Sequence, residues 1–408
     1  MKKIAIIGGG ASGLAAAVAA GESAYQAGEE VEVHLYEASD RIGRSILATG
    51  NGRCNFTNAQ IVADAYRNPS FVGTALTAFE KAFPKGRHPN GVAAFFAERG
   101  MLYREEGEGR MYPLANKASV VLDVLRSRLD VLEAHVHVEA RVDTIDTPRG
   151  DRPHFTMRMA DGAFERADAV ILACGGKVGR AMLPDAFAFV DQHPVLCSLA
   201  TDTTYVRELD NIRAKATLSL IRDDGIKAKE AGEVMFRKYG ISGICAFDLS
   251  RFAEPEDHLS VDFLPFVAEL DAQSFTADRM KALAPFFTDG VTCANFLEGM
   301  VLPRVADALL KYAGIEAGSP ANHPNSLKLM SALKDFRAEV KGPGDAEHAQ
   351  VQRGGFAVDG FDAETFEANA VPRLHVVGEA LDVDAPCGGF NLHWAFASGL
   401  MAGRSCVS

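Results

Sequence analysis

Apolar and polar positions follow a clear order over the first forty residues. Residues 3–7 form a short apolar run that predicts a buried strand, and the alanine-rich stretch 14–27 predicts a helix. Glycines separate the two, and residues 31–37 (VEVHLYE) predict a second strand. Strand, helix and strand in this order predict a βαβ unit, which begins a parallel sheet.

The same patterns predict further elements along the chain. Apolar residues at 120, 121, 124 and 125 share one face of a helix predicted over 117–129. Residues 68–100 also read as helical, with Pro and Gly breaks, and a last helix is predicted over 391–404. Strands are predicted over 136–145, 155–159, 170–173 and 374–377.

The pattern of predicted secondary structure changes after about residue 185. Residues 195–265 alternate short β-like pieces with turns, for example 216–221 and 259–263, and residues 270–340 read as helical. Lys341–Gly344 (KGPG) predicts a hinge-like linker, after which βα character returns. We therefore expect an α/β fold with a discontinuous nucleotide-binding domain over 1–188 and 346–408, a β-rich insert over 189–268 and a helical insert over 269–345.

Composition and charge narrow the class of protein. The chain has 408 residues, 48% of them hydrophobic, which is typical of a soluble globular protein. Its net charge of −12 disfavours a nucleic-acid partner, because an acidic surface repels a phosphate backbone. Seven cysteines are scattered singly, without CxxC or Cys/His ligand spacing, which predicts reduced thiols in a cytoplasmic protein and no metal site.

The N-terminus imitates a signal peptide, since Met1-Lys2-Lys3 is followed by an apolar run to Ala20. Glycines at 8, 9, 10 and 13 interrupt that run, so we expect a mature first strand instead. No later apolar run is long enough to span a bilayer, and we expect no membrane partner.

The interrupting glycines carry the first chemical signal. Gly8-Gly9-Gly10-Ala11-Ser12-Gly13 follows a strand, opens a helix and satisfies G-x-G-x-x-G. Gly8 permits the tight turn, Gly10 lets a pyrophosphate approach the backbone, and Gly13 lets the helix pack on the strand. Glu37 ends the next strand, where it can accept hydrogen bonds from a ribose and would repel the 2′-phosphate of NADP. A Gly-rich turn in an unrelated sheet is the alternative.

Two later segments end strands at glycine pairs. Residues 170–176 (VILACGG) form an apolar strand that runs into Gly175-Gly176. Residues 375–392 (HVVGEALDVDAPCGGFNL) end a strand at Gly378-Glu379, which places a carboxylate where ligands bind in such folds and where it could accept from ribityl hydroxyls. Gly388-Gly389 then expose amides just before a helix, whose N-terminus would stabilise negative charge on a reduced flavin.

Residues 49–58 (TGNGRCNFTN) form a polar loop that fits neither a helix nor a strand. Its glycines allow close approach of the backbone to a ligand, and its amides and asparagines can satisfy the polar edge of a flavin. Arg53, or Arg44 just before the loop, can offset phosphate charge. For the loop alone, an Asx-rich surface turn is the alternative.

In this combination the motifs resemble the BaiN-like or YhiN-like family of FAD-dependent oxidoreductases, also called the aminoacetone oxidase family. The matching segments are GGGASGLAAA at the start, GNGRCNFTN over 50–58, GRMYP with KA over 109–118, YGISG over 239–243 and the tail over 378–391. They run in order over nearly the whole chain. The resemblance implies a glutathione-reductase-type, Rossmann-like FAD-binding domain interrupted by a β-barrel-like insert and a helical insert.

Motifs and resemblance together give the candidate site residues. The FAD-binding candidates are Gly8, Gly10, Ala11, Ser12, Gly13, Glu37, Arg44, Arg53, Cys54, Asn55, Val142, Gly378, Glu379, Gly389, Phe390 and Asn391. By resemblance, Arg110 and Tyr112 could bind an anionic or carbonyl substrate, and Cys387 is a third catalytic candidate. Cys54 and Cys387 are either a redox-active pair or two unrelated thiols. His34 and His393 read as packing residues, although His393 could face the flavin.

The sequence thus predicts an FAD-dependent oxidoreductase that transfers hydride at flavin N5 to or from a small organic substrate. One fingerprint without a second nicotinamide domain implies that NAD(P)H, if it is the donor, visits the flavin transiently. Three alternatives stay open: an oxygen-using amine or aminoketone oxidase, an FAD-dependent RNA-modifying protein, and a non-catalytic flavin sensor or electron carrier.

Overall fold

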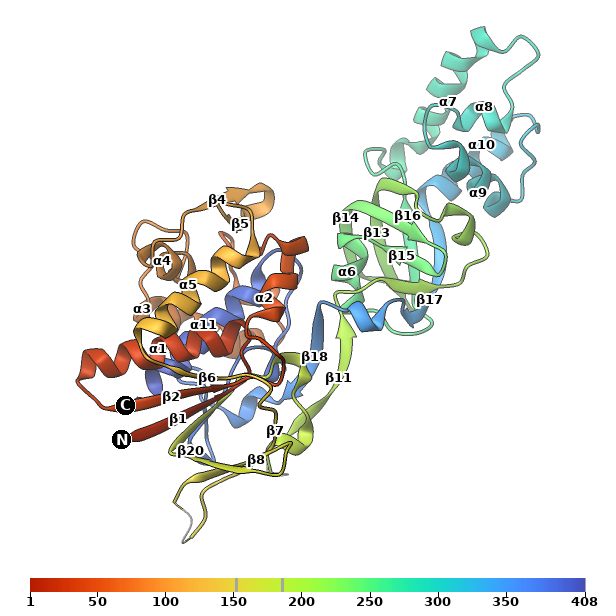
Figure 1. Cartoon of the computed structure of the whole chain (residues 1–408). Coiled ribbons are helices and arrows are strands. Elements are labelled where there is room, and N and C mark those ends of the chain that lie inside the picture. Colours follow the sequence, from red (N-terminus) through yellow and green to blue (C-terminus); the bar gives the residue numbers. More distant parts are fainter. Residues whose placement is uncertain (151–152, 185–186, 408) are drawn as a thin grey trace. The chain divides into compact units, whose positions relative to one another are not determined.

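The computed structural model describes residues 1–150, 153–184 and 187–407. The chain divides into two compact units, Met1–His193 with Val351–Ser408, and Pro194–Gln350 (Figure 1). Each unit has a buried apolar core of its own. The first unit contains both the N-terminal fingerprint and the C-terminal tail, and the second is inserted between them.

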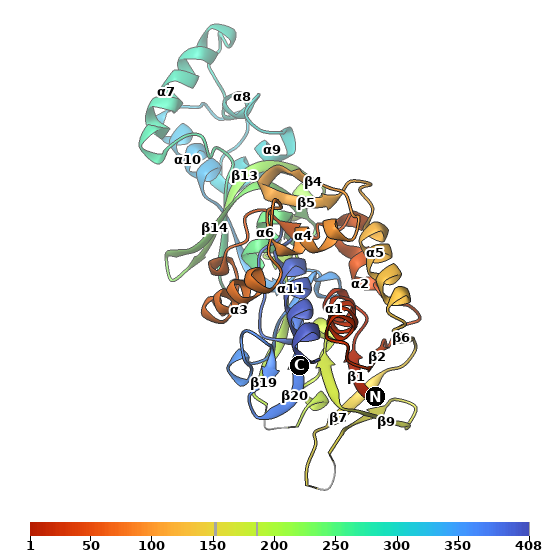
Figure 2. The ribbon, with the colours of Figure 1, turned by 90° about the vertical axis from the view of Figure 1, so that its left-hand side faces the viewer.

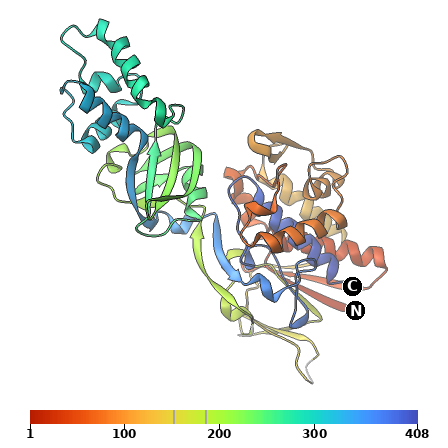
Figure 3. The same cartoon turned by 180° about the vertical axis from the view of Figure 1, so that it is seen from behind.

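A six-stranded sheet forms the centre of the first unit, with the strand order β19-β20-β10-β1-β2-β6. Its strands are β1 (Lys2–Ile7), β2 (Val31–Tyr36), β6 (His135–His137), β10 (Ala169–Leu172), β19 (Glu367–Ala368) and β20 (Val371–Val376). β1 pairs in parallel with β2 and β10, and only β19 runs antiparallel to its neighbour within this described sheet. The predicted βαβ unit is therefore confirmed. Lys2 Nζ donates to the Cys406 carbonyl at 2.8 Å, so the two ends of the chain lie close together (Figure 3).

Two helices with small residues at their contact pack side by side in this unit, α1 (Ala11–Ala27) and α11 (Phe390–Ser405) (Figure 2). A Cβ atom on Gly399 would come within 2.2 Å of the Ser12 carbonyl oxygen, and one on Gly403 within 2.2 Å of the Ala16 oxygen. Because the contact positions rise together along both helices, α1 and α11 run parallel. Glycine allows backbones to approach this closely. The remaining helices of the unit are α2 (Arg44–Ala48), α3 (Pro69–Ala82), α4 (Gly91–Glu98) and α5 (Ala118–Val131).

Two three-stranded sheets complete the first unit. They are formed by β7 (Val142–Asp146), β8 (Phe155–Met159) and β9 (Phe164–Ala167), and by β3 (Thr57–Asn58), β5 (Arg110–Pro113) and β4 (Tyr103–Glu106). The prediction of a single strand over 136–145 is wrong, because this range contains parts of two strands, β6 and β7, that belong to different sheets. Glu139 has φ 54°, and the amides of Glu139 and Ala140 donate to the Ser39 and Glu37 carbonyls. The chain therefore turns around the end of β2, which an apolar pattern does not reveal.

A closed six-stranded barrel organises the second unit, in the order β12-β15-β14-β13-β16-β17 (Figure 3). Its strands are β12 (Leu199–Thr201), β13 (Arg213–Arg222), β14 (Gly225–Arg237), β15 (Gly240–Ser242), β16 (His258–Asp262) and β17 (Phe336–Pro343). The helices of this unit are α6 (Ile244–Ser250), α7 (Ala272–Leu283), α8 (Cys293–Leu297), α9 (Pro303–Ala313) and α10 (His323–Lys334). The predicted fold class, an α/β domain with a barrel and helices inserted, is confirmed.

The end of the insert departs from the sequence prediction. The helix read through 336–340 ends at Lys334, and Lys341–Pro343 is part of β17 and not a linker. Phe336, Ala338 and Val340 are buried while alternate positions are not, so the period is that of a strand. β11 (Phe189–Val195) and β18 (Val351–Phe356) form a two-stranded sheet where the chain leaves and re-enters the first unit.

None of the seven cysteines, all of which lie in the described residues, is joined in a disulfide bond. Among the helices of the described residues, none combines the length and apolar character needed to cross a membrane.

Candidate functional site

The fingerprint turn joins β1 to α1 and has no room for side chains. Gly8 has φ 112°, and a Cβ atom there would lie 2.4 Å from the Ala173 carbonyl oxygen at the end of β10. A Cβ atom on Gly13 would lie 1.9 Å from the Gly8 oxygen. Gly10 precedes α1 and provides no side-chain cap, so the first-turn amides, including those of Ser12 and Gly13, receive no capping side chain at this end. These amides form the cradle expected for a pyrophosphate.

Glu37 closes one side of this cradle. Its carboxylate accepts hydrogen bonds from the Gly9 amide at 2.8 Å and from the Ser39 amide at 2.7 Å. A carboxylate has further acceptor positions, so a ribose hydroxyl could still be accommodated. The segment after it is tied to the same turn, since the Gly43 amide donates to the Gly9 carbonyl at 2.7 Å. Arg44 begins α2 and forms a long, exposed ion pair with Asp40.

The polar loop lies against the C-terminal tail. Gly50, Asn51, Gly52 and Cys54 all have left-handed backbone conformations, which explains the choice of Gly and Asn in this loop. The Asn55 side-chain oxygen accepts from the Met111 amide at 3.0 Å, which fixes the loop to β5.

The following strand, β3, makes the contact with the tail itself. Asn58 Nδ2 donates to the Gly388 carbonyl at 2.8 Å. A Cβ atom on Gly389 would come within 2.5 Å of the Thr57 carbonyl oxygen. Two segments more than 300 residues apart in the sequence are thus brought together, as the flavin hypothesis requires.

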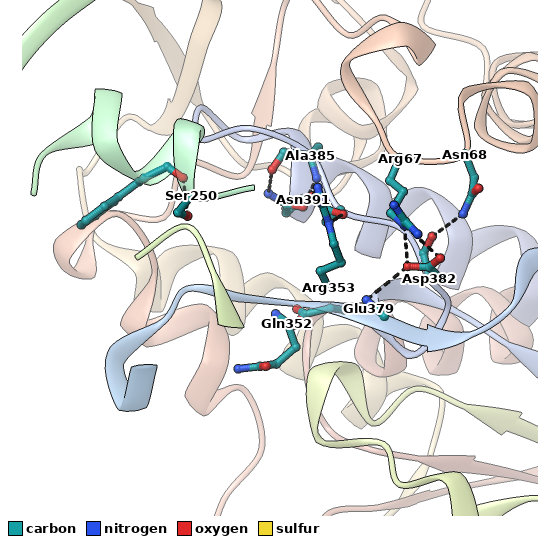
Figure 4. Close-up of polar contacts among 12 residues, drawn as sticks. Arg67, Asn68, Ser250, Gln352, Arg353, Glu379, Asp382, Ala385 and Asn391 are labelled. Carbon is teal, nitrogen blue, oxygen red and sulfur yellow. Dashed lines mark hydrogen bonds and ion pairs between the residues drawn. The ribbon is translucent and has the colours of Figure 1, made fainter. Parts of the chain in front are cut away.

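The tail follows β20 through a short 3-10 turn, Gly378–Ala380, and a loop that ends at α11. Gly378 lies against Ser12 of the fingerprint helix, and its amide donates to Ser398 Oγ at 3.0 Å. Asn391 holds the loop by accepting from the Ala385 amide at 2.9 Å and donating to the Ala385 carbonyl at 2.8 Å (Figure 4). Asn391 therefore shapes the loop through its own side chain.

Glu379 lies at the carboxyl end of β20, as the sequence predicts. Its Oε1 accepts from the Gln352 amide at 2.7 Å (Figure 4). Burial, and to a lesser extent the nearby Asp384 carboxylate, raise the pKa of Glu379 to about 7. The side chain can therefore change its charge near neutral pH, which makes it a candidate functional-site residue.

Two ion pairs to buried aspartates support the tail and were not found from the sequence. Asp382 accepts from Arg67 Nε at 2.8 Å, and Asp384 accepts from Arg353 Nε at 2.9 Å (Figure 4). Asp384 is fully buried, as is most of Asp382. The D-V-D pattern was visible in the tail, but nothing in the sequence indicates that residues 67 and 353 supply the arginines.

Other candidates have partners that the sequence did not predict. Arg53 contacts Glu106, donates to Asn116 Oδ1 at 2.5 Å and stacks 4.1 Å from the centre of the Tyr112 ring. Arg110 forms an ion pair with Glu108 at 3.1 Å. Phosphate binding by Arg53 and substrate binding by Arg110 and Tyr112 stay predictions.

The remaining candidates are placed at element ends or in buried loops. Burial raises the pKa of Cys54 to about 12, so its reactive thiolate form is disfavoured, whereas Cys387 is only partly buried. Val142 is the first residue of β7 and is buried. Phe390 begins α11, and its carbonyl accepts from Tyr66 Oη at 3.0 Å. Ala11 lies buried in the first turn of α1.

The N-termini of α1 and α11 point the same way but lie at different levels. Gly399 packs level with Ser12, so the level of Gly10 corresponds to residue 397 of α11. α11 begins at Phe390, just after Gly389, and therefore projects beyond the start of α1 by about 12 Å, at 1.5 Å per residue. Neither helix has a side-chain cap at its first turn. Two anion-stabilising ends at this offset fit an elongated dinucleotide, with its phosphates at α1 and a second acceptor group at α11.

The fold and this glycine cradle define a dinucleotide-binding protein of the Rossmann-like class. Comparison with known proteins then identifies the family. Residues 2–405 match the family described as HI0933-like protein Rossmann domain. The chain belongs to this family, and it is an FAD-dependent oxidoreductase, which confirms the resemblance to BaiN-like and YhiN-like proteins.

Relatives in bacteria match this chain over nearly its whole length. A 3-dehydro-bile acid delta(4,6)-reductase of Clostridium scindens is 32% identical over 433 residues, covering 100% of this chain and 99% of the relative. A ribosomal RNA dihydrouridine synthase of Escherichia coli is 25% identical over 421 residues, covering 99% and 97%. Among solved structures, a 3-ketosteroid delta1-dehydrogenase of Sterolibacterium denitrificans matches over 100% of both chains, with 12% identity and a TM-score of 0.46.

Proposed function

We propose that this protein reduces a carbon–carbon double bond conjugated to a carbonyl group in a small organic substrate. The observation that carries the proposal is the end-to-end match, at 32% identity, to a reductase that acts on a delta(4,6) bile acid. We propose NAD(P)H as the hydride donor. The described residues contain one dinucleotide fingerprint, which we assign to FAD, so NAD(P)H would approach the flavin transiently without a binding domain of its own.

The residues that would hold FAD follow from the geometry of the cradle. The Gly8–Gly13 turn would receive the pyrophosphate, and Glu37 would accept from the adenosine ribose. Glu379 would face the ribityl chain, from the carboxyl end of β20. The loop 49–58 and the start of α11 would line the flavin ring, since β3 and Gly389 are in direct contact.

Bound FAD supplies hydride transfer at N5, and the chain supplies orientation and electrostatics. The first turn of α11 presents backbone amides and the positive end of the helix dipole, which would stabilise negative charge on a reduced flavin bound there. The ion pairs Arg67–Asp382 and Arg353–Asp384, whose aspartates are buried, would hold the preceding loop in place and so keep these donors aligned.

The test begins with the absorption spectrum of the purified protein, taken anaerobically before and after NADH or NADPH. We expect a flavin spectrum that is bleached by one of the two and restored by a cyclic ketone with a conjugated double bond. The saturated ketone is the matched control and should restore nothing. Absence of a flavin after reconstitution with FAD would contradict the cofactor assignment, and bleaching by aminoacetone alone would favour the oxidase alternative.

A second candidate function is reduction of a uracil ring in RNA. Two relatives, from Escherichia coli and Haemophilus influenzae, are ribosomal RNA dihydrouridine synthases, each 25% identical over nearly the whole chain. Dihydrouridine formation also reduces a double bond conjugated to a carbonyl, so the chemistry would be shared. The net charge of −12 argues against an RNA partner. Reoxidation of the reduced flavin by ribosomal RNA, but not by the ketone, would make this the better function.

A further inference from the structure

Three buried polar side chains meet beneath the first turn of α11. Thr57 on β3, Asn90 before α4 and His393 in α11 are each at least nine-tenths buried. Thr57 Oγ1 lies 2.8 Å from His393 Nδ1, and Asn90 Nδ2 lies 3.1 Å from Thr57 Oγ1. Polar groups at this depth avoid a desolvation cost when they are paired, and here Thr57 Oγ1 is paired with both His393 Nδ1 and Asn90 Nδ2.

The direction of each hydrogen bond follows from Asn90. Its Oδ1 accepts from the Ala93 amide at 3.0 Å and caps α4, while its Nδ2 donates to the Asn58 carbonyl at 2.8 Å. The amide group is thereby oriented, and Nδ2 must also donate to Thr57 Oγ1. The Thr57 hydroxyl then donates to His393 Nδ1, because Nδ1 is the acceptor that the described residues place within reach of this buried O–H, which would otherwise donate to nothing.

This direction assigns the state of His393. Its Nδ1 accepts a hydrogen bond, so the imidazole is neutral and carries its proton on Nε2. Burial lowers the pKa of His393 to about 3, which agrees with the assignment. Asn90, Thr57 and His393 therefore form a hydrogen-bonded relay, by which we mean three neutral side chains held in a fixed order and not a path for proton transfer.

The relay connects the elements that line the proposed flavin site. His393 belongs to the turn that begins at Gly389, since its amide donates to the Gly389 carbonyl at 3.0 Å. Thr57 lies beside Gly389 through its backbone, and its neighbour Asn58 donates to the Gly388 carbonyl. One side chain on each of three segments thus sets the position of the uncapped end of α11 relative to the loop 49–58.

We propose that His393, Thr57 and Asn90 are positioning residues for the flavin: they fix the first turn of α11 so that its amides stabilise the reduced cofactor. The inference rests on the proposed FAD site, not on the identity of the substrate. The relay acts by geometry, because a neutral imidazole adds no charge to the helix N-terminus. Its loss should make the reduction potential of bound FAD more negative.

The experiment compares Thr57→Val with Thr57→Ser in the FAD-loaded full chain. Valine has the shape of threonine but cannot donate to His393 or accept from Asn90, whereas serine keeps the hydroxyl. We expect Thr57→Val to weaken FAD binding about tenfold and to shift the potential to a more negative value, and Thr57→Ser to restore both. His393→Asn keeps an acceptor near the Nδ1 position and should resemble wild type more closely than His393→Leu.

Thr276→Val is the matched control, because Thr276 is also buried and, among the described residues, its hydroxyl bonds only to the Ala272 carbonyl of its own helix α7. It should lower the melting temperature without changing the potential or FAD affinity. If Thr57→Val lowers the melting temperature, as the control does, but leaves FAD affinity and reduction potential unchanged, the positioning role is wrong. If Thr57→Val does not fold, the two His393 variants decide in the same way. Failure of the wild type to bind FAD would contradict the proposed function instead.

The shift should be the same at pH 6 and pH 8, since His393 is neutral at both. Because Glu379 in the same site has a pKa of about 7, the comparison is repeated with Glu379→Gln in both proteins. A shift that still grows as the pH falls would show that the imidazole acts through its charge, and would contradict a purely geometric role.

Discussion

At the scale of single residues, the site depends on glycines, because a side chain at these positions would collide with neighbouring backbone atoms. A Cβ atom on Gly13 would lie 1.9 Å from the backbone oxygen of Gly8, far inside any real contact. The turn and the helix that follows it cannot separate without disturbing the cradle. The glycine fingerprint read from the sequence thus has a direct steric cause in the fold.

Gly13→Ala should therefore lower the free energy of unfolding by at least about 2 kcal/mol, the cost of forcing atoms into a packed site, and should abolish FAD binding. Gly179→Ala is the control, because the same added atom would meet nothing there and Gly179 has an ordinary backbone conformation. Chemical denaturation and FAD titration of both variants check this. Equal stability of the two variants would show that the turn relaxes freely.

Glu379 offers a second prediction at this scale, through its titration. Its pKa of about 7 in the folded protein exceeds the ordinary value of 4.5, so the folded state binds a proton more tightly than the unfolded state. Stability should then fall as the pH rises from 4.5 to 7. Glu379→Gln, which keeps an acceptor for the Gln352 amide, should stabilise the FAD-free protein by roughly 2–3 kcal/mol at pH 8 and by little at pH 4.5.

Urea unfolding of the FAD-free protein at the two pH values measures this difference. Glu29→Gln, at an exposed position, is the control and should show no gain that depends on pH. A Glu379→Gln variant that is no more stable than wild type at pH 8 would mean that the carboxylate is well solvated.

At the scale of elements, buried charges hold the tail loop. The Arg353 and Asp384 side chains are 13% and 0% exposed, so removal of one partner leaves a charge without its counterpart. We expect Asp384→Asn to cost about 3–5 kcal/mol of stability. Arg213→Ala, which breaks an exposed ion pair with Glu233 on the barrel, should cost at most about 1 kcal/mol. Similar losses in the two variants would contradict a structural role for the buried pair.

At the scale of elements, apolar periodicity predicted some helices and strands correctly and failed for two segments. The fingerprint strand, its helix and the second strand were predicted because each has a clear period and the glycines mark the turn. Residues 336–343 were misread because Phe336, Ala338 and Val340 follow a helical segment directly and only barrel pairing reveals their alternation. The break between β6 and β7 was missed because it depends on hydrogen bonds to the end of β2.

At the scale of the whole molecule, the two units have separate cores, and the ends of the second unit lie close together. The Gln350 amide donates to the Leu196 carbonyl at 3.4 Å, and the Gly344 amide to the Ser198 carbonyl at 2.8 Å. A segment with its own core and adjacent ends has the properties of an independently folding domain.

We therefore expect the fragment 194–350 to fold alone, with a cooperative thermal transition in circular dichroism. The remaining chain, with residues 193 and 351 joined by a short flexible linker, should still bind FAD, since the cradle, the polar loop and the tail all belong to the first unit. A fragment that shows no transition, or a shortened chain that no longer binds FAD, would contradict this division.

The sequence by itself determined the dinucleotide-binding turn, the interrupted α/β fold and the family, because these depend on local periods, glycine spacing and ordered motifs. Only the tertiary structure decided which side chains support the site. Arg67 and Arg353 reach the tail aspartates, and Thr57 reaches His393, across more than 300 residues in two of these cases. Such pairings leave no local signal, since they require only a polar residue at each of two distant positions that the fold brings together.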